Sequence, residues 1–198
     1  MDSARIRAEF PILQQRVHGK PLVYLDNAAS VQKPQAVINA VSECYGGYYA
    51  NIHRGVHLLS ERSTSAYEST RDKVRSFLNA ASSKEIIFTR GTTESINLVA
   101  TSFGAHAIRA GDTILITGMG HHSNIVPWQL LCARTGAHLQ VVPFTDQGEL
   151  RLDEYQRLLH GPVKLVAFVH ISNALGTVNP AREMIALAHA QGIPVLVD

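Results

Sequence analysis

A turn of small residues, Gly91-Thr92-Thr93, follows a short apolar run and precedes a helical pattern. The first N–H groups of a helix have no partners within it and lie at the positive end of its dipole, so such a turn can bind phosphate. The hydroxyls of Thr92 and Thr93 would add two donors. An ordinary threonine N-cap is the competing interpretation. No Walker lysine follows the turn, which excludes a P-loop.

Two adjacent histidines, His121 and His122, lie between another apolar run and another helical pattern. An imidazole at this place could stack on a flat ring and carry protons near neutral pH. A loop histidine without a special role is the alternative. Metal binding is disfavoured, because neighbouring histidines on one turn seldom bind the same ion. The His53–His57 pair has Arg54 where a zinc-protease motif requires Glu, so we expect no metal site.

Two further polar groups follow apolar runs. Asn173 lies in the polar loop 170–179 and could donate to a ligand oxygen, although asparagine in a loop is often only turn chemistry. Asp198 follows the apolar run 194–197 directly. A carboxylate after a buried strand is costly unless a partner compensates for it, which favours a functional role for Asp198.

The elements that must position these residues alternate between two patterns. Runs rich in Val, Ile and Leu predict strands, and amphipathic segments between them predict helices. The predicted strands are 85–89, 113–117, 139–143, 164–170 and 194–197, and the predicted helices are 93–103, 124–134, 152–159 and 181–190. This alternation predicts an α/β fold with a mostly parallel central sheet covered by helices on both faces. Because ligands bind at the carboxyl ends of such strands, the polar residues above are expected to share one site.

The first part of the chain shows a different pattern. We expect a short helix and a short extended piece, 22–26, within the first 30 residues, followed by helices over 34–45 and 59–78. Three glycines, Gly111, Gly136 and Gly192, stand where a helix would hand over to a strand and are expected to end those helices.

Composition narrows the classes of function. The 198 residues are 45% hydrophobic and 17% charged, with a formal net charge of +2, which is a globular composition. Basic residues do not cluster, so nucleic acid is not an expected partner. No apolar run predicts a signal peptide or a membrane helix. Cys44 and Cys132 lack metal or redox spacing and are expected to act as small hydrophobic residues. We therefore expect a cytoplasmic protein that does not bind membranes.

Taken in order, several segments resemble the group II, SUF-type cysteine desulfurases among the class V aminotransferase-like enzymes of pyridoxal 5'-phosphate (PLP). The matching segments are YLDNAAS (24–30), NIHRGVH (51–57), TRGTTESIN (89–97), HHSNIVPWQ (121–129), SNALGT (172–177) and VLVD (195–198). The likeness extends over nearly the whole chain, in the family's order and spacing.

The resemblance implies a role for each candidate residue. Thr92 and Thr93 would bind the PLP phosphate, and His121 would stack on the pyridine ring and shuttle protons. Asn173 would donate to the phenolic oxygen of PLP, and Asp198 would pair with the ring nitrogen. The substrate-side residues would be Ala28, Ala29 and His53.

The resemblance also implies an organisation and a reaction. The fold would be the PLP-transferase (aspartate aminotransferase-like) large domain in incomplete form. Residues 1–30 would be an N-terminal segment of the small domain with a substrate-side loop, and residues 31–198 the first part of the PLP-binding large domain. The intact enzyme would be a homodimer that converts L-cysteine to L-alanine and a persulfide. It would pass the sulfur to an acceptor protein for iron–sulfur cluster assembly.

Two departures from the family pattern are visible. Gly120 stands where relatives usually carry Glu before the paired histidines, and a flexible residue there would loosen the turn that positions His121. The Schiff-base lysine and the persulfide cysteine of the family have no counterpart, so we expect a truncated chain that is inactive alone. A selenocysteine lyase acting on L-selenocysteine, another class V enzyme, and a non-catalytic PLP-binding or dimerising module remain alternatives.

Overall fold

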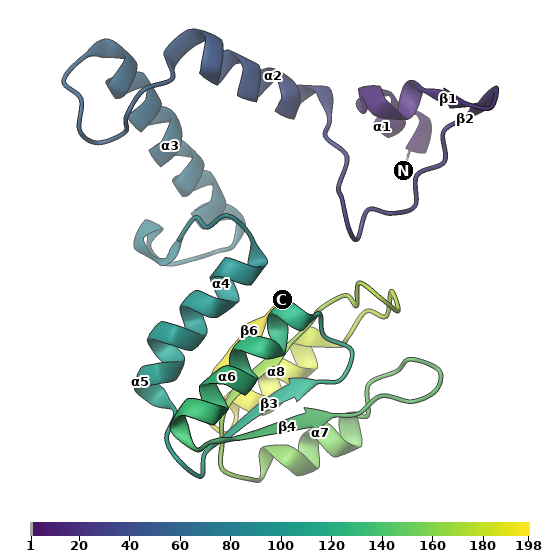
Figure 1. The fold of residues 1–198 in the computed structure, drawn as a ribbon, viewed down its shortest axis with the longest axis vertical. Helices are drawn as coiled ribbons and strands as arrows, with labels where there is room; N and C mark the ends of the chain where they lie inside the picture. Colours follow the sequence, from purple (N-terminus) through teal and green to yellow (C-terminus); the bar gives the residue numbers. More distant parts are fainter. Residues whose placement is uncertain (1) are drawn as a thin grey trace. The chain divides into compact units, whose positions relative to one another are not determined.

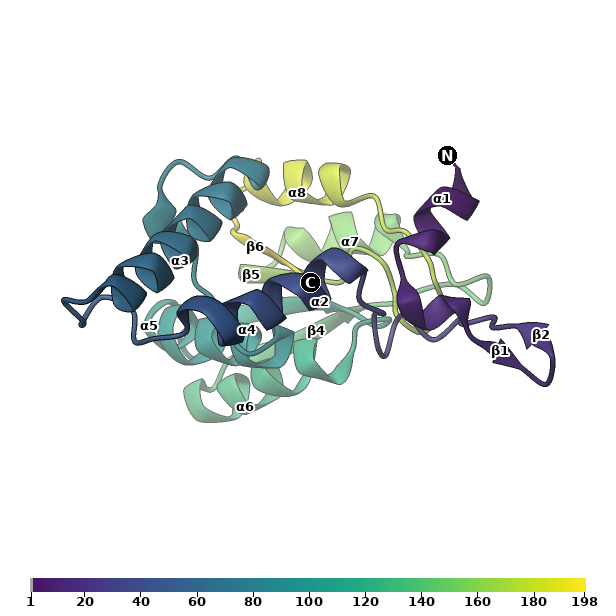
Figure 2. The same cartoon turned by 90° about the horizontal axis from the view of Figure 1, so that it is seen from above.

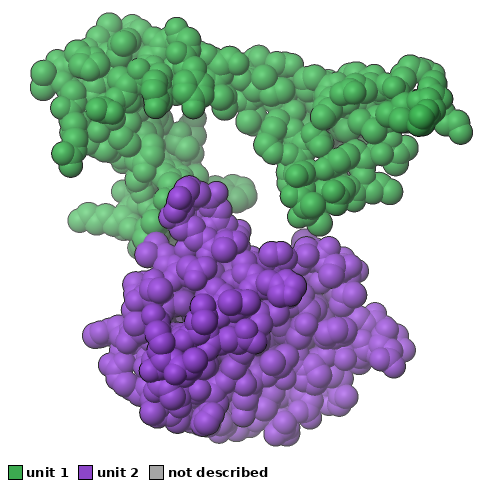
Figure 3. Space-filling view, viewed as in Figure 1, with its two compact units in different colours: residues 1–88 green, residues 89–198 purple. Residues whose placement is uncertain are grey.

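The computed structural model describes residues 2–198, which form two compact units that meet in sequence between Phe88 and Thr89 (Figure 3). The second unit contains the predicted alternation of strands and helices. The domain boundary predicted at residue 30 is a different division of the chain, and it stays a prediction.

The second unit is built on a four-stranded parallel sheet in the order β4-β3-β5-β6. Figure 1 labels three of these strands, β3, β4 and β6. The strands are β3 (Thr113–Thr117), β4 (His138–Val142), β5 (Val163–Phe168) and β6 (Val195–Val197). All three ladders are parallel, with Ile116 opposite Ala167, and Ala167 opposite Leu196. The predicted α/β fold is therefore confirmed, and the bounds of these four strands differ from the expected ones by at most two residues.

Helices cover both faces of this sheet, as the two views show (Figures 1 and 2). They are α4 (Thr92–Val99), with the π-helical turn η4 (Ala100–Gly104) and the short α5 (Ala105–Ala107), then α6 (Val126–Thr135), α7 (Leu152–Leu159) and α8 (Ala181–His189). Successive residues of β3 point to opposite faces. Ile114 and Ile116 pack with Trp128 of α6, whereas Leu115 packs with Tyr155 of α7 and Met184 of α8.

Two helix ends follow the predicted glycine chemistry. Gly136 ends α6 in the left-handed conformation with φ 76°, and its N–H donates to the carbonyl of Cys132. Gly192 follows α8 with positive φ, and its N–H donates to the carbonyl of His189 over 2.9 Å. A residue with a side chain would be strained at these positions. Gly111 also has positive φ, but the prediction that it ends a helix is wrong, because α5 already ends at Ile108 in an extended conformation.

The strand predicted over 85–89 is not formed, which corrects the sequence-based expectation. Residues 83–85 form a single 3₁₀ turn, η3 (Ser83–Glu85), and Ile86 is extended without a ladder partner. A strand exists only through pairing, and no strand in the described part of the chain lies beside this segment. The carbonyl of Ile86 instead accepts a hydrogen bond from Arg71.

The first unit consists of helices and turns with little buried apolar surface. Its elements are α1 (Ser3–Ala8), η1 (Pro11–Gln14), the hairpin of β1 (Arg16–Val17) and β2 (Lys20–Pro21), α2 (Gln35–Glu43), the π-helical turn η2 (Cys44–Tyr48) and α3 (Leu58–Phe77). The predicted extended piece 22–26 is not part of a sheet. Within residues 2–88 the only buried residues are Ser60, Ser63 and Ile86.

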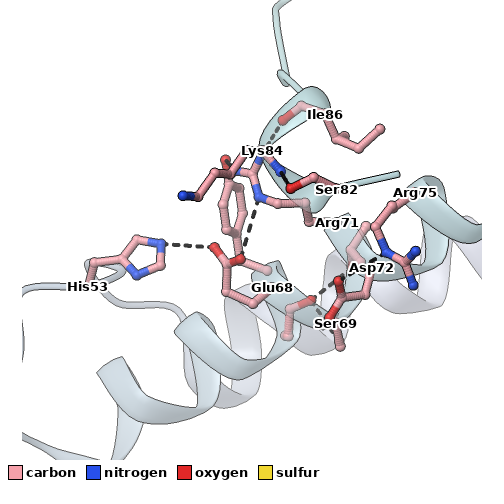
Figure 4. Close-up of polar contacts among 12 residues, drawn as sticks. His53, Glu68, Ser69, Arg71, Asp72, Arg75, Ser82, Lys84 and Ile86 are labelled. Carbon is pink, nitrogen blue, oxygen red and sulfur yellow. Dashed lines mark hydrogen bonds and ion pairs between the residues drawn. The ribbon is translucent and has the colours of Figure 1, made fainter. Parts of the chain in front are cut away.

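A polar and aromatic cluster fixes the chain after α3 to that helix (Figure 4). The Arg71 guanidinium lies 5.0 Å from the centroids of both the Tyr67 and Phe88 rings and donates to the Tyr67 hydroxyl over 2.8 Å. Glu68 pairs with Arg71 over 3.5 Å and with His53 over 3.2 Å. The cation–π contacts account for the position of residues 86–88 without any strand pairing.

Over residues 2–198, no helix combines the length and apolar character needed to cross a bilayer. Both cysteines are free thiols, with Cys132 buried and Cys44 half-buried, as expected for small hydrophobic residues. Burial raises the pKa of the Cys132 thiol.

The buried hydroxyl of Tyr155 gives a test of this packing. It donates to the carbonyl of Met184 over 2.8 Å and joins α7 to α8 beneath the sheet. Tyr155→Phe leaves that carbonyl without its donor, so we expect the free energy of unfolding to fall by about 1–2 kcal/mol in urea denaturation. Tyr45→Phe is the control, because the Tyr45 side chain is 69% exposed. Equal stability of the two variants would contradict the role of this hydrogen bond.

Candidate functional site

The candidate site lies where β3, β5 and β6 end. The three strands are parallel, and after a register shift at the start of β3 their last residues pair regularly. Thr117, Phe168 and Val197 therefore end at the same edge of the sheet. The segments that follow carry His121, Asn173 and Asp198. The fold therefore delivers three of the predicted residues to one edge.

The phosphate candidate lies at the start of α4. Gly91 is the N-cap residue, and no side chain caps this helix. The hydroxyl of Thr89 bonds the hydroxyl of Ser95 over 2.7 Å, and Glu94 bonds the N–H of Arg90. These side chains thus bond elsewhere and do not cap the helix. Within the described part of the chain, the N–H groups of Thr92 and Thr93 have no acceptor. The alternative of an ordinary threonine N-cap is wrong here, because Thr92 is already inside the helix.

The turn that carries the histidines packs against α4. His121 caps the 3₁₀ turn η5 (His122–Asn124): its Nδ1 accepts from the Ser123 N–H over 3.2 Å and lies 2.9 Å from the Ser123 hydroxyl oxygen. Asn124 anchors the same turn to the core, since its buried side-chain oxygen accepts from Trp128 Nε1 over 2.8 Å. The His121 ring is thus positioned by the turn, while His121 itself stays exposed.

The loop after β5 is tied to the loop after β3. The Ser172 hydroxyl donates to the Met119 carbonyl over 3.3 Å, and Asn179 donates to the Met119 sulfur over 3.3 Å and to the Val169 carbonyl over 2.7 Å. Both residues are buried, whereas the predicted residue Asn173 is exposed and makes no hydrogen bond among residues 2–198. Sequence reasoning missed the two anchors; their place at the ends of a short polar loop is the only signal for them.

Asp198 is held by its backbone at the end of β5. Its N–H donates to Phe168 and its carbonyl accepts from His170, both over 2.9 Å. Burial raises the pKa of the Asp198 carboxyl, and the charge of His121 opposes that shift. No cation within ion-pair distance of this carboxylate belongs to residues 2–198. The carboxylate is therefore partly desolvated and suited to a ligand that carries a positive N–H group.

Two other polar atoms near this edge also lack partners. The Thr117 hydroxyl and the Asn179 side-chain oxygen are buried without a hydrogen bond within residues 2–198. Buried polar groups without partners are costly and uncommon. The Thr117 hydroxyl lies at the end of β3, and the Asn179 oxygen lies in the loop after β5. Both atoms therefore belong to segments that form the candidate site.

The three substrate-side predictions fall in the first unit, so whether they join this site stays a prediction. Ala28 and Ala29 form a turn closed by hydrogen bonds from Ala29 and Ser30 to Asp26. His53 has φ 63°, unusual for a side-chain residue, and its Nε2 pairs with Glu68 over 3.2 Å (Figure 4).

Gly120 does not adopt the left-handed backbone conformation that glycine tolerates. Its φ is not in the left-handed region, and its N–H donates to the Thr117 carbonyl over 3.3 Å. A Cβ added there would lie 3.5 Å from that carbonyl oxygen, an ordinary contact. The turn is therefore closed by hydrogen bonds at Gly120, and a residue with a side chain would fit.

Comparisons with known proteins cover the whole chain. The sequence model of the family described as "Aminotransferase class-V" matches residues 23–198. A cysteine desulfurase from Synechococcus elongatus is 57% identical over 197 residues, which are 100% of this chain and 32% of the relative. One from Escherichia coli is 53% identical over 194 residues, 98% of this chain and 48% of the relative. The chain thus spans about a third to a half of the length of these curated relatives.

The structural comparison agrees. The apo structure of a cysteine desulfurase from Thermococcus onnurineus aligns with a TM-score of 0.90 and 37% identity, covering 99% of this chain and 47% of the other. The predicted PLP-transferase fold is confirmed by this match, in which the chain spans 47% of the other structure.

The burial of Asp198 predicts a pH dependence of stability. Because its pKa is higher in the folded chain, the stability that this carboxyl contributes is complete below the ordinary Asp value of 3.8 and is lost as the pH rises through the folded value. We expect Asp198→Asn to become progressively more stable than the unsubstituted chain as the pH rises from below 3.8 toward neutrality, measured by urea denaturation.

The control is Asp146→Asn, which changes an exposed carboxylate in the turn after β4. A stability difference for Asp198→Asn that does not change with pH would show that burial of this carboxyl costs nothing.

Proposed function

The chain belongs to the class-V aminotransferase family, and we propose that it forms the N-terminal, PLP-contacting half of a cysteine desulfurase. The observation that carries the proposal is the pairing, within one unit, of an uncapped helix start with a partly desolvated carboxylate. Free helix N–H groups suit a phosphate, and such a carboxylate suits a protonated ring nitrogen. PLP, the cofactor of this family, carries both groups.

The phosphate would bind at the start of α4. The N–H groups of Thr92 and Thr93 and their hydroxyls supply donors in a place where the helix dipole favours an anion. The Gly91 N-cap leaves the space over the helix start open, since a Cβ added there would meet nothing within 4 Å. These features support a phosphate cradle.

The ring would lie between the loops after β3 and β5 and Asp198, which follows β6. Asp198 would accept from the ring nitrogen and keep it protonated. When bound, PLP supplies an electron-withdrawing ring that stabilises negative charge on the substrate carbon. His121 would stack on the ring face and hold a proton for transfer, and the exposed Asn173 would donate to the phenolic oxygen. We assign to this chain the binding and orientation of PLP and the transfer of a proton by His121.

The substrate we propose is L-cysteine, with alanine and enzyme-bound sulfur as products. The support is the name shared by relatives that are 52–57% identical over nearly the whole chain. As finer proposals of the same kind, the enzyme would be a cytoplasmic homodimer of the group II type. It would pass sulfur to an acceptor protein for iron–sulfur cluster assembly.

The phosphate cradle can be tested with pyridoxine 5'-phosphate, which lacks the aldehyde of PLP and so does not react with lysines. In equilibrium dialysis, Thr93→Ala is expected to weaken its binding about tenfold, because a hydrogen bond to a charged group is lost. Binding of unphosphorylated pyridoxine should not change.

Thr101→Ala is the matched control, because the Thr101 hydroxyl donates only to carbonyls of its own helix, at 2.8 Å from Asn97 and 3.3 Å from Leu98. If Thr93→Ala and Thr101→Ala bind the phosphate ester equally well, the cradle is elsewhere.

The reaction can be tested in a full-length protein that contains this sequence together with a Schiff-base lysine and a persulfide cysteine, purified with PLP. We expect release of alanine from L-cysteine, and a rate at least about tenfold lower for Asp198→Asn, since an acid–base pair with the ring is replaced by a neutral contact. Chromatographic measurement of alanine checks this outcome. Bound PLP without any alanine release from L-cysteine would refute the proposed substrate.

A further inference from the structure

Ser123 makes two contacts with one nitrogen of His121. Its backbone N–H points at Nδ1 over 3.2 Å, and its hydroxyl oxygen lies 2.9 Å from the same atom. The turn is closed further by the Asn124 N–H, which donates to the His121 carbonyl over 2.8 Å. The ring edge at Nδ1 is therefore occupied by Ser123.

These contacts restrict where the ring proton can be. A backbone N–H can only donate, so the atom it points at must present a lone pair. In neutral imidazole one nitrogen carries the proton and the other accepts, so an accepting Nδ1 requires the proton on Nε2. The Ser123 hydroxyl then donates to Nδ1 as well. A hydroxyl can turn and accept instead, which the N–H cannot do.

The opposite nitrogen is free to meet a ligand. Within residues 2–198, both side-chain hydrogen bonds of His121 are made at Nδ1 and none at Nε2. The groups that face this ring are His122, whose ring is edge-on at 5.9 Å between centroids, and the carboxylate of Asp198, whose pKa the His121 charge lowers. An N–H at Nε2 would therefore be offered to an acceptor in the candidate site.

We propose that Ser123 is a positioning residue that fixes neutral His121 as the Nε2–H tautomer, so that His121 meets its ligand as a proton donor. The ligand would present an acceptor such as a carboxylate oxygen. When the ring takes a second proton, that proton goes to Nδ1, the Ser123 hydroxyl turns to accept from it, and the hydrogen bond from the Ser123 N–H is lost. This refinement rests on the proposed function for its meaning in catalysis, but the tautomer is a property of the chain alone.

The test is the tautomer itself, measured without any cofactor. Histidine nitrogens are labelled with ¹⁵N in the 198-residue chain, and two-bond ¹⁵N–¹H correlation spectra identify the protonated nitrogen. His121→Gln assigns the signal among the ten histidines. We expect a proton on Nε2 and a lone pair on Nδ1. A His121 ring that is mainly protonated at Nδ1 when neutral would overturn the proposal.

Two substitutions separate the N–H from the hydroxyl. Ser123→Pro removes the N–H, which can only donate, so the Nδ1–H fraction relative to Nε2–H should rise about fivefold, the effect of one ordinary hydrogen bond. Ser123→Ala keeps the N–H and removes a hydroxyl that can serve either tautomer, so the ratio should stay close to the original. The control is Ser102→Ala, because the Ser102 hydroxyl donates to the Leu98 carbonyl within its own helix. An unchanged ratio in folded Ser123→Pro, or a neutral His121 that is mainly Nδ1–H in Ser123→Ala, contradicts the proposal.

These outcomes are distinguishable from those of the proposed function. If pyridoxine 5'-phosphate does not bind but the tautomer follows Ser123, the cofactor assignment fails and the positioning role stands. If pyridoxine 5'-phosphate binds but the tautomer ratio does not depend on Ser123, the positioning role fails and the cofactor assignment stands.

Discussion

Parallel pairing of β3, β5 and β6 is the constraint on which the candidate site depends. Pairing in register brings the ends of these strands to one edge, although the residues that follow them are separated by up to 77 positions, from His121 to Asp198. In the order β4-β3-β5-β6, β5 lies between β3 and β6, which are the two most widely separated of these three strands in the sequence. The loops after β3 and β5 are then joined through Met119, which accepts from both Ser172 and Asn179. The sheet thus supplies the edge, and the loop bonds fix its shape.

The candidate site combines polar groups that have hydrogen-bond partners with polar groups that have none in the described part of the chain. Asn124 and Ser172 are buried and bonded, and they hold the turns that carry exposed residues. The start of α4, the Thr117 hydroxyl and the Asp198 carboxylate lack such partners within residues 2–198. Unmet polar groups cost free energy and are retained where a ligand meets them. The contrast between rigid supports and open donors is the arrangement expected of a preorganised binding site.

Much of this fold follows from periodicity in the sequence. The bounds of β3 and α7 were predictable to the residue, because apolar runs end at turns and the α7 pattern repeats at helical spacing. The strand expected over 85–89 fails for a physical reason: local sequence can favour extension, but a ladder needs a neighbour, and Arg71 takes the Ile86 carbonyl instead. Candidate residues at strand ends were predictable from their place. Their supports were not, because the bonds of Asn179 and Ser123 depend on where turns bring atoms together. Whether Ala28, Ala29 and His53 complete the site stays open to experiment.

The hydrogen bond from Trp128 to Asn124 has a practical consequence. Trp128 is the only tryptophan in the chain and is fully buried against β3, yet its indole N–H ends on the turn that follows His121. Indole emission responds to changes at that nitrogen. The molecule therefore carries an intrinsic fluorophore in its hydrophobic interior. A single hydrogen bond of 2.8 Å joins this fluorophore to the turn that carries His121 at the candidate site. A ligand that shifts this turn on binding would change the emission of Trp128 without an attached dye.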